Sequence, residues 1–161
     1  MIEKIYQELK VGEKAFVEKT LTETDVYLYA GITGDFSWLH VNEMRAQEGH
    51  FKTRIVHGIL LVGLISNVVG NRLPGAGTIY ECQNISFIRP CYFNDTIRAQ
   101  VEVLEVLPKG RAKLRTSCYN QHGELVIDGD AVVIPPRQHV IDETGEEGDR
   151  STYEQILYRV S

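Results

Sequence analysis

The stretch from Arg54 to Leu73 reads R-I-V-H-G-I-L-L-V-G-L-I-S-N-V-V-G-N-R-L. It is apolar on nearly all sides and long enough for a helix of about four turns. Gly70 can end this helix. Because a helix that is apolar all round has to be buried on all sides, we expect the remaining chain to wrap around it.

The segments on either side of this helix show the alternation of apolar and polar residues that is typical of half-buried strands. One strand is expected at residues 14–21, and four more are expected after the helix, at 78–87, 96–106, 112–119 and 125–134. A sheet of about five antiparallel strands can curl around a single apolar helix and bury it. The sequence therefore predicts an α+β domain with the arrangement called the hotdog fold.

Length and charge narrow the class of partner. A chain of 161 residues suits one domain. We place that domain at residues 1–136, followed by an acidic extension, 137–161, whose end is compatible with a short helix. The net charge of −5 argues against a nucleic-acid partner, and no basic run suggests binding to a membrane surface. A small molecule or another protein is the expected partner.

The three cysteines are widely spaced and form no C-x-x-C pair, so neither a disulfide framework nor a thiolate zinc site is indicated. The N-terminal residues show no secretory signal. The longest apolar run, 55–69, is interrupted by His57 and by glycines and is too short to cross a bilayer. We expect a cytoplasmic protein that does not enter a membrane.

The candidate catalytic residues lie before the apolar helix, in a stretch that reads Y-A-G-I-T-G-D-F-S-W-L-H-V-N-E-M-R-A, residues 29–46. T-E-T-D at 22–25 predicts the capped start of a short helix that ends at Gly31. Asp35 and His40 are five residues apart, so on one continuous helix they would point in different directions. Glycine and serine around Asp35 allow a turn that brings both side chains to one point. Together they could hold a water molecule and transfer its proton.

Ordinary explanations exist for both residues, because an aspartate often caps the helix that follows it and a histidine can be simply half-buried. Gly58 also has two explanations. It stands at the start of the apolar helix, where free backbone N–H groups can stabilise an oxyanion, or it allows a neighbouring strand to pack closely. Residues 47–54 are expected to be a polar surface connection in which His50 is solvated.

With the whole order in view, the sequence resembles the MaoC-like (R)-specific enoyl-CoA hydratases over about residues 10–136. Three motifs carry the resemblance: Y-A-G-I-T-G-D-F-x-x-L-H at 29–40, R-I-V-H-G-I-L at 54–60, and S-F-x-x-P at 86–90 followed by N-D-T at 94–96. The resemblance implies reversible hydration of trans-2-enoyl thioesters to (3R)-3-hydroxyacyl thioesters, a step of fatty acid metabolism. It also implies a hotdog dimer and a lyase that needs no metal or redox cofactor.

Position by position, the resemblance assigns catalysis to Asp35 and His40 and the oxyanion amide to Gly58. Ser66 matches a hydroxyl near the catalytic pair, although a serine inside a helix often bonds back to a carbonyl one turn earlier. His57 is expected to pack or to orient a loop. The substrate is expected to be an acyl-CoA or acyl carrier protein thioester, and the protein a homodimer or an oligomer of dimers.

One departure from the family pattern lies inside the catalytic loop, where Ser37-Trp38 replaces the usual Asn-Pro. Loss of proline frees the turn that aims His40. Trp38 could line the substrate entrance or pack against a dimer partner. Val69 and Val132 are candidates for the acyl pocket that sets chain length, and the alternative for both is the core.

Two other functions are compatible with a hotdog fold. A thioesterase of this fold usually carries its carboxylate on the central helix, but residues 56–71 contain no Asp or Glu. A non-catalytic acyl-thioester-binding subunit would have lost the active residues, whereas Asp35 and His40 are both present.

Overall fold

The computed structural model describes residues 4–136 and contains one antiparallel sheet of five strands in the order β1-β3-β4-β5-β2. The strands are β1 (Lys14–Thr20), β2 (Ile79–Phe87), β3 (Thr96–Leu107), β4 (Arg111–Tyr119) and β5 (Leu125–Ile134). All five strands predicted from the sequence are confirmed to within one or two residues. Short 3₁₀ turns, Tyr6–Glu8 and Pro108–Gly110, precede β1 and join β3 to β4.

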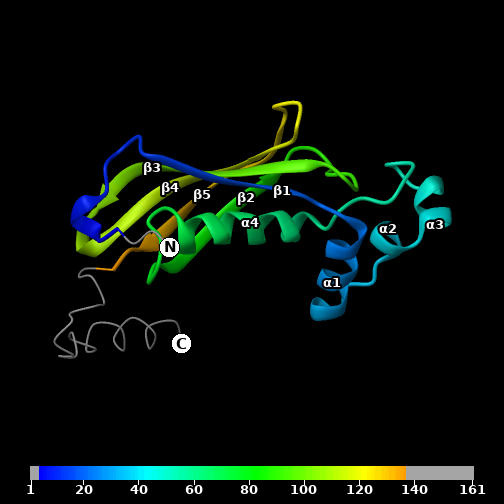
Figure 1. The fold of residues 1–161 in the computed structure, drawn as a ribbon, viewed down its shortest axis with the longest axis horizontal. Coiled ribbons are helices and arrows are strands. Elements are labelled where there is room, and N and C mark those ends of the chain that lie inside the picture. The colour runs from blue at the N-terminus through cyan, green and yellow to red at the C-terminus, as the bar shows by residue number, and fades with distance from the viewer. Residues whose placement is uncertain (1–3, 137–161) are drawn as a thin grey trace.

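Helix α4 (Gly58–Asn71) lies along one face of this sheet (Figure 1). Its buried residues contact the inward side chains of β3 and β4 in one apolar core: Leu61, Leu64, Ile65, Val68 and Val69 from the helix, and Ile97, Ala99, Val101, Val103, Ala112, Leu114 and Cys118 from the strands. This is the hotdog fold that the sequence predicts.

The expectation that α4 is buried on all sides is wrong. Gly63, Ser66 and Asn67 are exposed, and 53% of Ile59 is open to solvent. The reason is geometric, because five strands reach around only one side of the helix. The face of α4 that carries these four residues is not covered by any other element within residues 4–136. Within these residues, no helix is long and apolar enough to span a membrane.

Three short helices extend beyond the end of the sheet at which α4 begins (Figure 1). The first, α1 (Glu23–Thr33), starts with the predicted cap: the hydroxyl of Thr22 accepts the N–H of Asp25, whose carboxylate accepts the N–H of Thr22. It ends at Gly34, which has φ +77°, and not at Gly31 as expected. A left-handed residue terminates a helix, whereas Gly31 keeps helical geometry.

The second and third of these helices are α2 (Trp38–Val41) and α3 (Glu43–Glu48). The predicted surface connection is therefore helical at its beginning, and only residues 49–57 run irregularly to α4. Arg54 ties this part together: its Nη1 lies 2.6 Å from a carboxylate oxygen of Glu23, and its Nε lies 3.2 Å from one of Glu43. Helices α1 and α3 are thus both held to the segment that leads into α4.

The outer face of the sheet, which points away from α4, is charged. Opposite charges pair across neighbouring strands, with distances of 2.8 Å for Arg98 and Glu18, 3.2 Å for Lys14 and Glu102, and 3.1 Å for Arg115 and Asp128. Surface pairs of this kind add little stability each, but they show that this face is in water. The acidic extension, 137–161, lies outside the described residues, so the boundary of the domain at residue 136 stays a prediction.

Gly129 provides a test of the register between β2 and β5. A Cβ at this position would stand 2.1 Å from the backbone oxygen of Asn84, whereas a Cβ at Gly31 in α1 would meet nothing within 4 Å. We expect Gly129→Ala to lower the free energy of unfolding by about 3 kcal/mol because the backbone has to move. Gly31→Ala should raise it by about 0.5–1 kcal/mol. Urea denaturation measures both, and a Gly129→Ala protein as stable as the wild type would contradict the register.

Candidate active site

Asp35 and His40 meet because the chain turns twice between α1 and α2. Gly34 ends α1 in the left-handed conformation, and α2 begins three residues after Asp35 and carries His40. The nearest side-chain ligand atoms of Asp35, His40 and His57 all lie within 4.8 Å of one another. The structure thus brings together the two side chains that the sequence selected, and adds a third.

The two oxygens of the Asp35 carboxylate make different contacts. Oδ1 accepts the backbone N–H of Ser37 at 3.2 Å, which is a local turn bond and not a helix cap, because the N-cap residue of α2 is Ser37. Oδ2 lies 3.8 Å from Nε2 of His57. Half of the side chain is exposed, so the turn bond leaves the carboxylate accessible to water and to a ligand.

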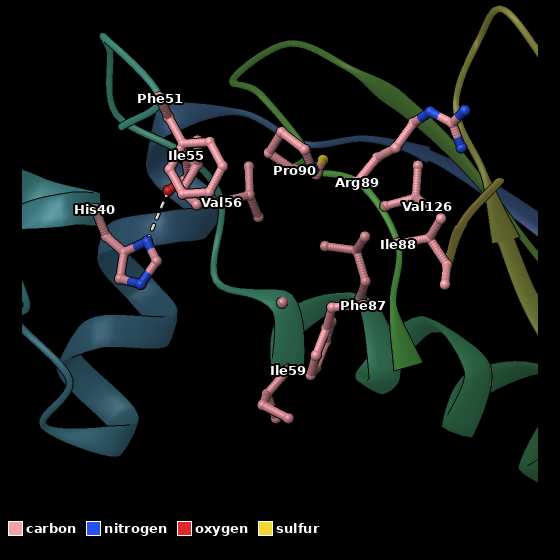
Figure 2. A pocket seen from close by; sticks show the side chains of 13 residues that line it. His40, Phe51, Ile55, Val56, Ile59, Phe87, Ile88, Arg89, Pro90 and Val126 are labelled. Carbon is pink, nitrogen blue, oxygen red and sulfur yellow. Dashed lines mark hydrogen bonds between the residues drawn. The ribbon is translucent and has the colours of Figure 1, made fainter. Parts of the chain in front are cut away.

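His40 is fixed by one hydrogen bond. Its Nδ1 lies 2.7 Å from the carbonyl oxygen of Ile55, drawn as a dashed line in Figure 2. Since a carbonyl can only accept, Nδ1 carries the hydrogen and Nε2 keeps its lone pair. The imidazole is therefore a base at Nε2. Burial lowers the pKa of His40, and the neighbouring His57 lowers it further, while the Ile55 carbonyl and Asp35 act in the opposite direction.

His40 and Gly58 line one cavity of about 370 Å³ (Figure 2). The other lining residues are mostly apolar: Phe51, Ile55, Val56, Ile59, Leu61, Phe87, Ile88, Arg89, Pro90, Cys91 and Val126. Because α4 begins at Gly58, the first N–H groups of the helix have no acceptor within it. A donor for a developing negative charge and a base therefore stand on the wall of the same apolar space.

Close packing also explains why residue 58 is glycine. A Cβ there would stand 2.6 Å from Cε1 of Phe87, whose ring lies over the start of α4. The two explanations offered for Gly58 from the sequence are thus compatible, because the close approach of Phe87 keeps this position without a side chain while the helix start leaves its amide free.

Asp35, His40 and His57 also form a group that could hold a metal, with two imidazole nitrogens and one carboxylate oxygen. However, Nε2 of His57 lies 3.0 Å from the backbone oxygen of Asp35 and has to donate its hydrogen to it. That hydrogen would have to leave before the atom could bind a metal. Proton transfer fits this arrangement better than metal binding does.

Comparison with known proteins shows the family of this chain. Residues 8–122 match the family model described as "MaoC like domain". The chain belongs to this family. It is 43% identical to an (R)-specific enoyl-CoA hydratase of Rhodospirillum rubrum over 81% of this chain and 91% of that protein. It is 38% identical to a 3-hydroxybutyryl-CoA dehydratase of Methylorubrum extorquens, over 85% and 87% of the two chains.

Solved structures of the MaoC-like family resemble this fold closely. R-hydratase PhaJ1 from Pseudomonas aeruginosa, in its unliganded form, is 40% identical and superposes with a TM-score of 0.81, covering 84% of this chain and 88% of that one. The hotdog architecture and the family resemblance inferred from the three sequence motifs are thereby confirmed.

The other candidate residues, Ser66 from the resemblance and the two valines proposed for the acyl pocket, lie away from the pair. Ser66 is on the exposed face of α4, about 12 Å along the helix axis from Gly58. Val69 is in the core with 1% of its surface exposed. Val132 lies opposite Cys82 and Lys113, between the buried Ala131 and Val133, so it points to the outer face of the sheet. Within one chain these three residues do not surround a common cavity.

Trp38 occupies the first position of α2, a place where helices accept proline. Its ring packs toward α3, at 3.2 Å from where a Cβ of Gly49 would stand, and the guanidinium of Arg45 lies 5.7 Å from the ring centre. Trp38 is not among the residues that line the cavity shared by His40 and Gly58. Its assignment to the substrate entrance stays a prediction.

Two residues near the candidate site were not selected from the sequence as catalytic or binding residues, although His57 was expected to pack or to orient a loop. His57, which has only 2% of its side chain exposed, stacks on His40. Arg89 lines the cavity, although the sequence shows it only as one x in S-F-x-x-P. For His57 a signal was present, because a histidine in an apolar run directly before a helix-starting glycine has to find polar partners when it is buried.

The environment of His40 gives a testable titration. Because burial and His57 lower its pKa, His40 should take up a proton only below pH 6.5, the ordinary value. The unfolded chain then binds this proton first, so His40 contributes stability that is lost as pH falls below 6.5. NMR titration of the His40 ring in the folded protein and in urea measures the difference. A midpoint at or above that of the unfolded chain would contradict the described geometry.

Proposed function

We propose that this protein is a lyase that hydrates trans-2-enoyl-CoA to (3R)-3-hydroxyacyl-CoA and catalyses the reverse dehydration. The observation that carries the proposal is the meeting of Asp35 and His40 beside the start of α4, where His40 and Gly58 line one apolar cavity. The names of the relatives from Rhodospirillum rubrum and Methylorubrum extorquens support the same reaction and the same type of substrate.

In the proposed reaction, a water molecule held between Asp35 and Nε2 of His40 loses a proton to one of them as its oxygen attacks C3 of the enoyl group. The pair returns a proton to C2, so one water is added across the double bond. Negative charge develops on the thioester oxygen meanwhile. An N–H at the start of α4, at Gly58, would stabilise that charge, an effect typically about 10²–10³ in rate.

The cavity suits an acyl thioester. Its walls are mostly apolar, as an acyl chain requires, and Arg89 lies across the cavity from His40 in Figure 2. A cation at that end would favour a negatively charged carrier such as CoA, and an acyl carrier protein carries its acyl group on a similar phosphate-bearing arm. Hydrolysis of the thioester is less well supported, because α4 (Gly58–Asn71) contains no carboxylate.

We also propose that the protein is a homodimer in the cytoplasm. Strand β2 pairs with β5 on one side only, and no described strand covers its other edge. Beside it, the exposed face of α4 contains Ile59 and Gly63. A second copy could cover both, because symmetric dimers bury the same patch on each subunit. The three cysteines, all free, are consistent with a reducing compartment.

The central prediction concerns the catalytic pair. Asp35→Asn and His40→Ala should each lower the turnover of crotonyl-CoA by about 10²-fold or more, because each removes one proton-transfer group. Loss of the enoyl absorbance measures turnover, and chiral analysis of the product should give the 3R isomer. His122→Ala, on the exposed β4–β5 hairpin, is the matched control and should stay active. Near-normal turnover in either site variant would remove that residue from the mechanism.

The dimer is tested separately by light scattering. We expect the wild-type protein to have twice the mass of one chain at micromolar concentration. Gly63→Arg should shift it toward the monomer, since a Cβ at this position would meet nothing within 4 Å among the described residues and the arginine would enter the proposed interface. His122→Arg adds the same charge elsewhere and should stay dimeric. A wild-type monomer would refute the proposal.

A further inference from the structure

His57 contacts both members of the proposed catalytic pair. Its ring stacks on the ring of His40 with centroids 3.8 Å apart and an angle of 28° between the planes. Its Nε2 lies 3.0 Å from the backbone oxygen of Asp35. Two residues that are five positions apart in the loop are therefore held by one residue from another part of the chain.

The same residue is joined to the third part of the site. His57 is the N-cap residue of α4 and directly precedes Gly58, whose amide is the proposed oxyanion donor. A shift of His57 relative to α4 would therefore change the distance from the oxyanion donor to the acid–base pair. In the other direction, the Ile55 carbonyl that fixes His40 lies only two residues before His57.

The contacts of His57 also exclude it as the acid or base. Its Nε2 hydrogen is used by the Asp35 carbonyl, which can only accept. Its Nδ1 is buried without a hydrogen-bond partner within residues 4–136, and only 2% of the side chain is exposed. The ring of Tyr29, with its centroid 4.9 Å away, packs against it. Neither nitrogen of His57 is therefore accessible to a substrate, since Nε2 is hydrogen-bonded and Nδ1 is buried.

We infer that His57 is a positioning residue: its Nε2–H fixes the main chain at Asp35 and its ring face fixes the plane of His40, so that both are aimed at a substrate whose thioester oxygen lies at Gly58. This inference rests on the proposed hydratase function. It requires that His57 act through two separable contacts, one polar and one through the ring face, which different substitutions can remove one at a time.

Three variants separate the contacts. His57→Gln keeps an N–H donor for the Asp35 carbonyl but loses the ring, His57→Phe keeps a ring against His40 but loses the donor, and His57→Leu loses both. Misplacement of a catalytic group typically costs about 10- to 100-fold in rate. We expect His57→Leu to lower kcat for crotonyl-CoA by this amount with KM within about threefold, and His57→Gln and His57→Phe each to recover part of the loss.

A second readout reports on His40 itself. His57 is one of the groups that lower the pKa of His40, with burial the larger cause and with Asp35 and the Ile55 carbonyl opposing it. Replacing the imidazole by glutamine should therefore move the NMR titration of the His40 ring to higher pH. It should also move the acid limb of the kcat/KM profile in the same direction. The control, His122→Gln, changes an exposed histidine of the hairpin and should change neither.

The outcomes are distinct. If all three His57 variants lose thermal stability but keep the kcat and the His40 titration of the wild type, His57 is only structural and the inference is overturned. If wild-type protein does not hydrate crotonyl-CoA, the proposed function fails, and the NMR titration then decides on His57 alone: an unchanged His40 midpoint in His57→Gln overturns the inference, and a raised midpoint supports it.

Discussion

The structure depends on the burial of one side of α4 against the concave face of the sheet. Inward residues of β3 and β4, among them Val101 and Leu114, are fully buried under Ile65 and Val68 of the helix. Removing this apolar area from water is the main favourable contribution to folding a domain of this kind. Because the helix packs against the sheet along its length, its first residue has a fixed position relative to the sheet. The residues that contact this end of the helix are therefore also held in place.

The proposed catalytic groups collect at that fixed point. Helices α1 to α3 lie beyond the end of the sheet at which α4 begins (Figure 1). The turn after α1 carries Asp35, and α2 carries His40. Contacts made by Arg54 and by the Ile55 carbonyl attach this outlying part to the segment leading into the helix. The sheet and α4 supply a rigid frame and the amide of Gly58, while the turn after α1 and helix α2 supply Asp35 and His40.

The strands could be predicted from the sequence because alternation with a period of two appears directly in the residues, and β5 was predicted at its observed bounds. Convergence of Asp35 and His40 was also predictable from their spacing. The end of α1 was not, since Gly31 and Gly34 are equally good as local signals and only the path of the chain decides between them. Helix α3 has only six residues, too few for a periodic pattern.

The sequence could not show on which face of the sheet Val132 lies or which residues His57 contacts, because both depend on contacts between distant segments. Residues 131–134 of β5 are all apolar, so the local sequence does not show which of them point into the core and which point to the outer face. The pairing of β5 with β2 and β4 decides this. The position of His57 depends on where the loop from α1 folds back, which is a contact between distant segments.

The crossed ion pairs on the outer face of the sheet have a consequence for assembly. Charged side chains keep this face hydrated: Arg98, Glu18, Arg115 and Asp128. Two sheets therefore cannot stack face to face without removing water from these charges. The helix side and the outer edges of β1 and β2 remain for contact between copies among the described residues. Copies that met through these surfaces would keep both charged faces in water, so growth into a fibre by stacking of sheets is disfavoured.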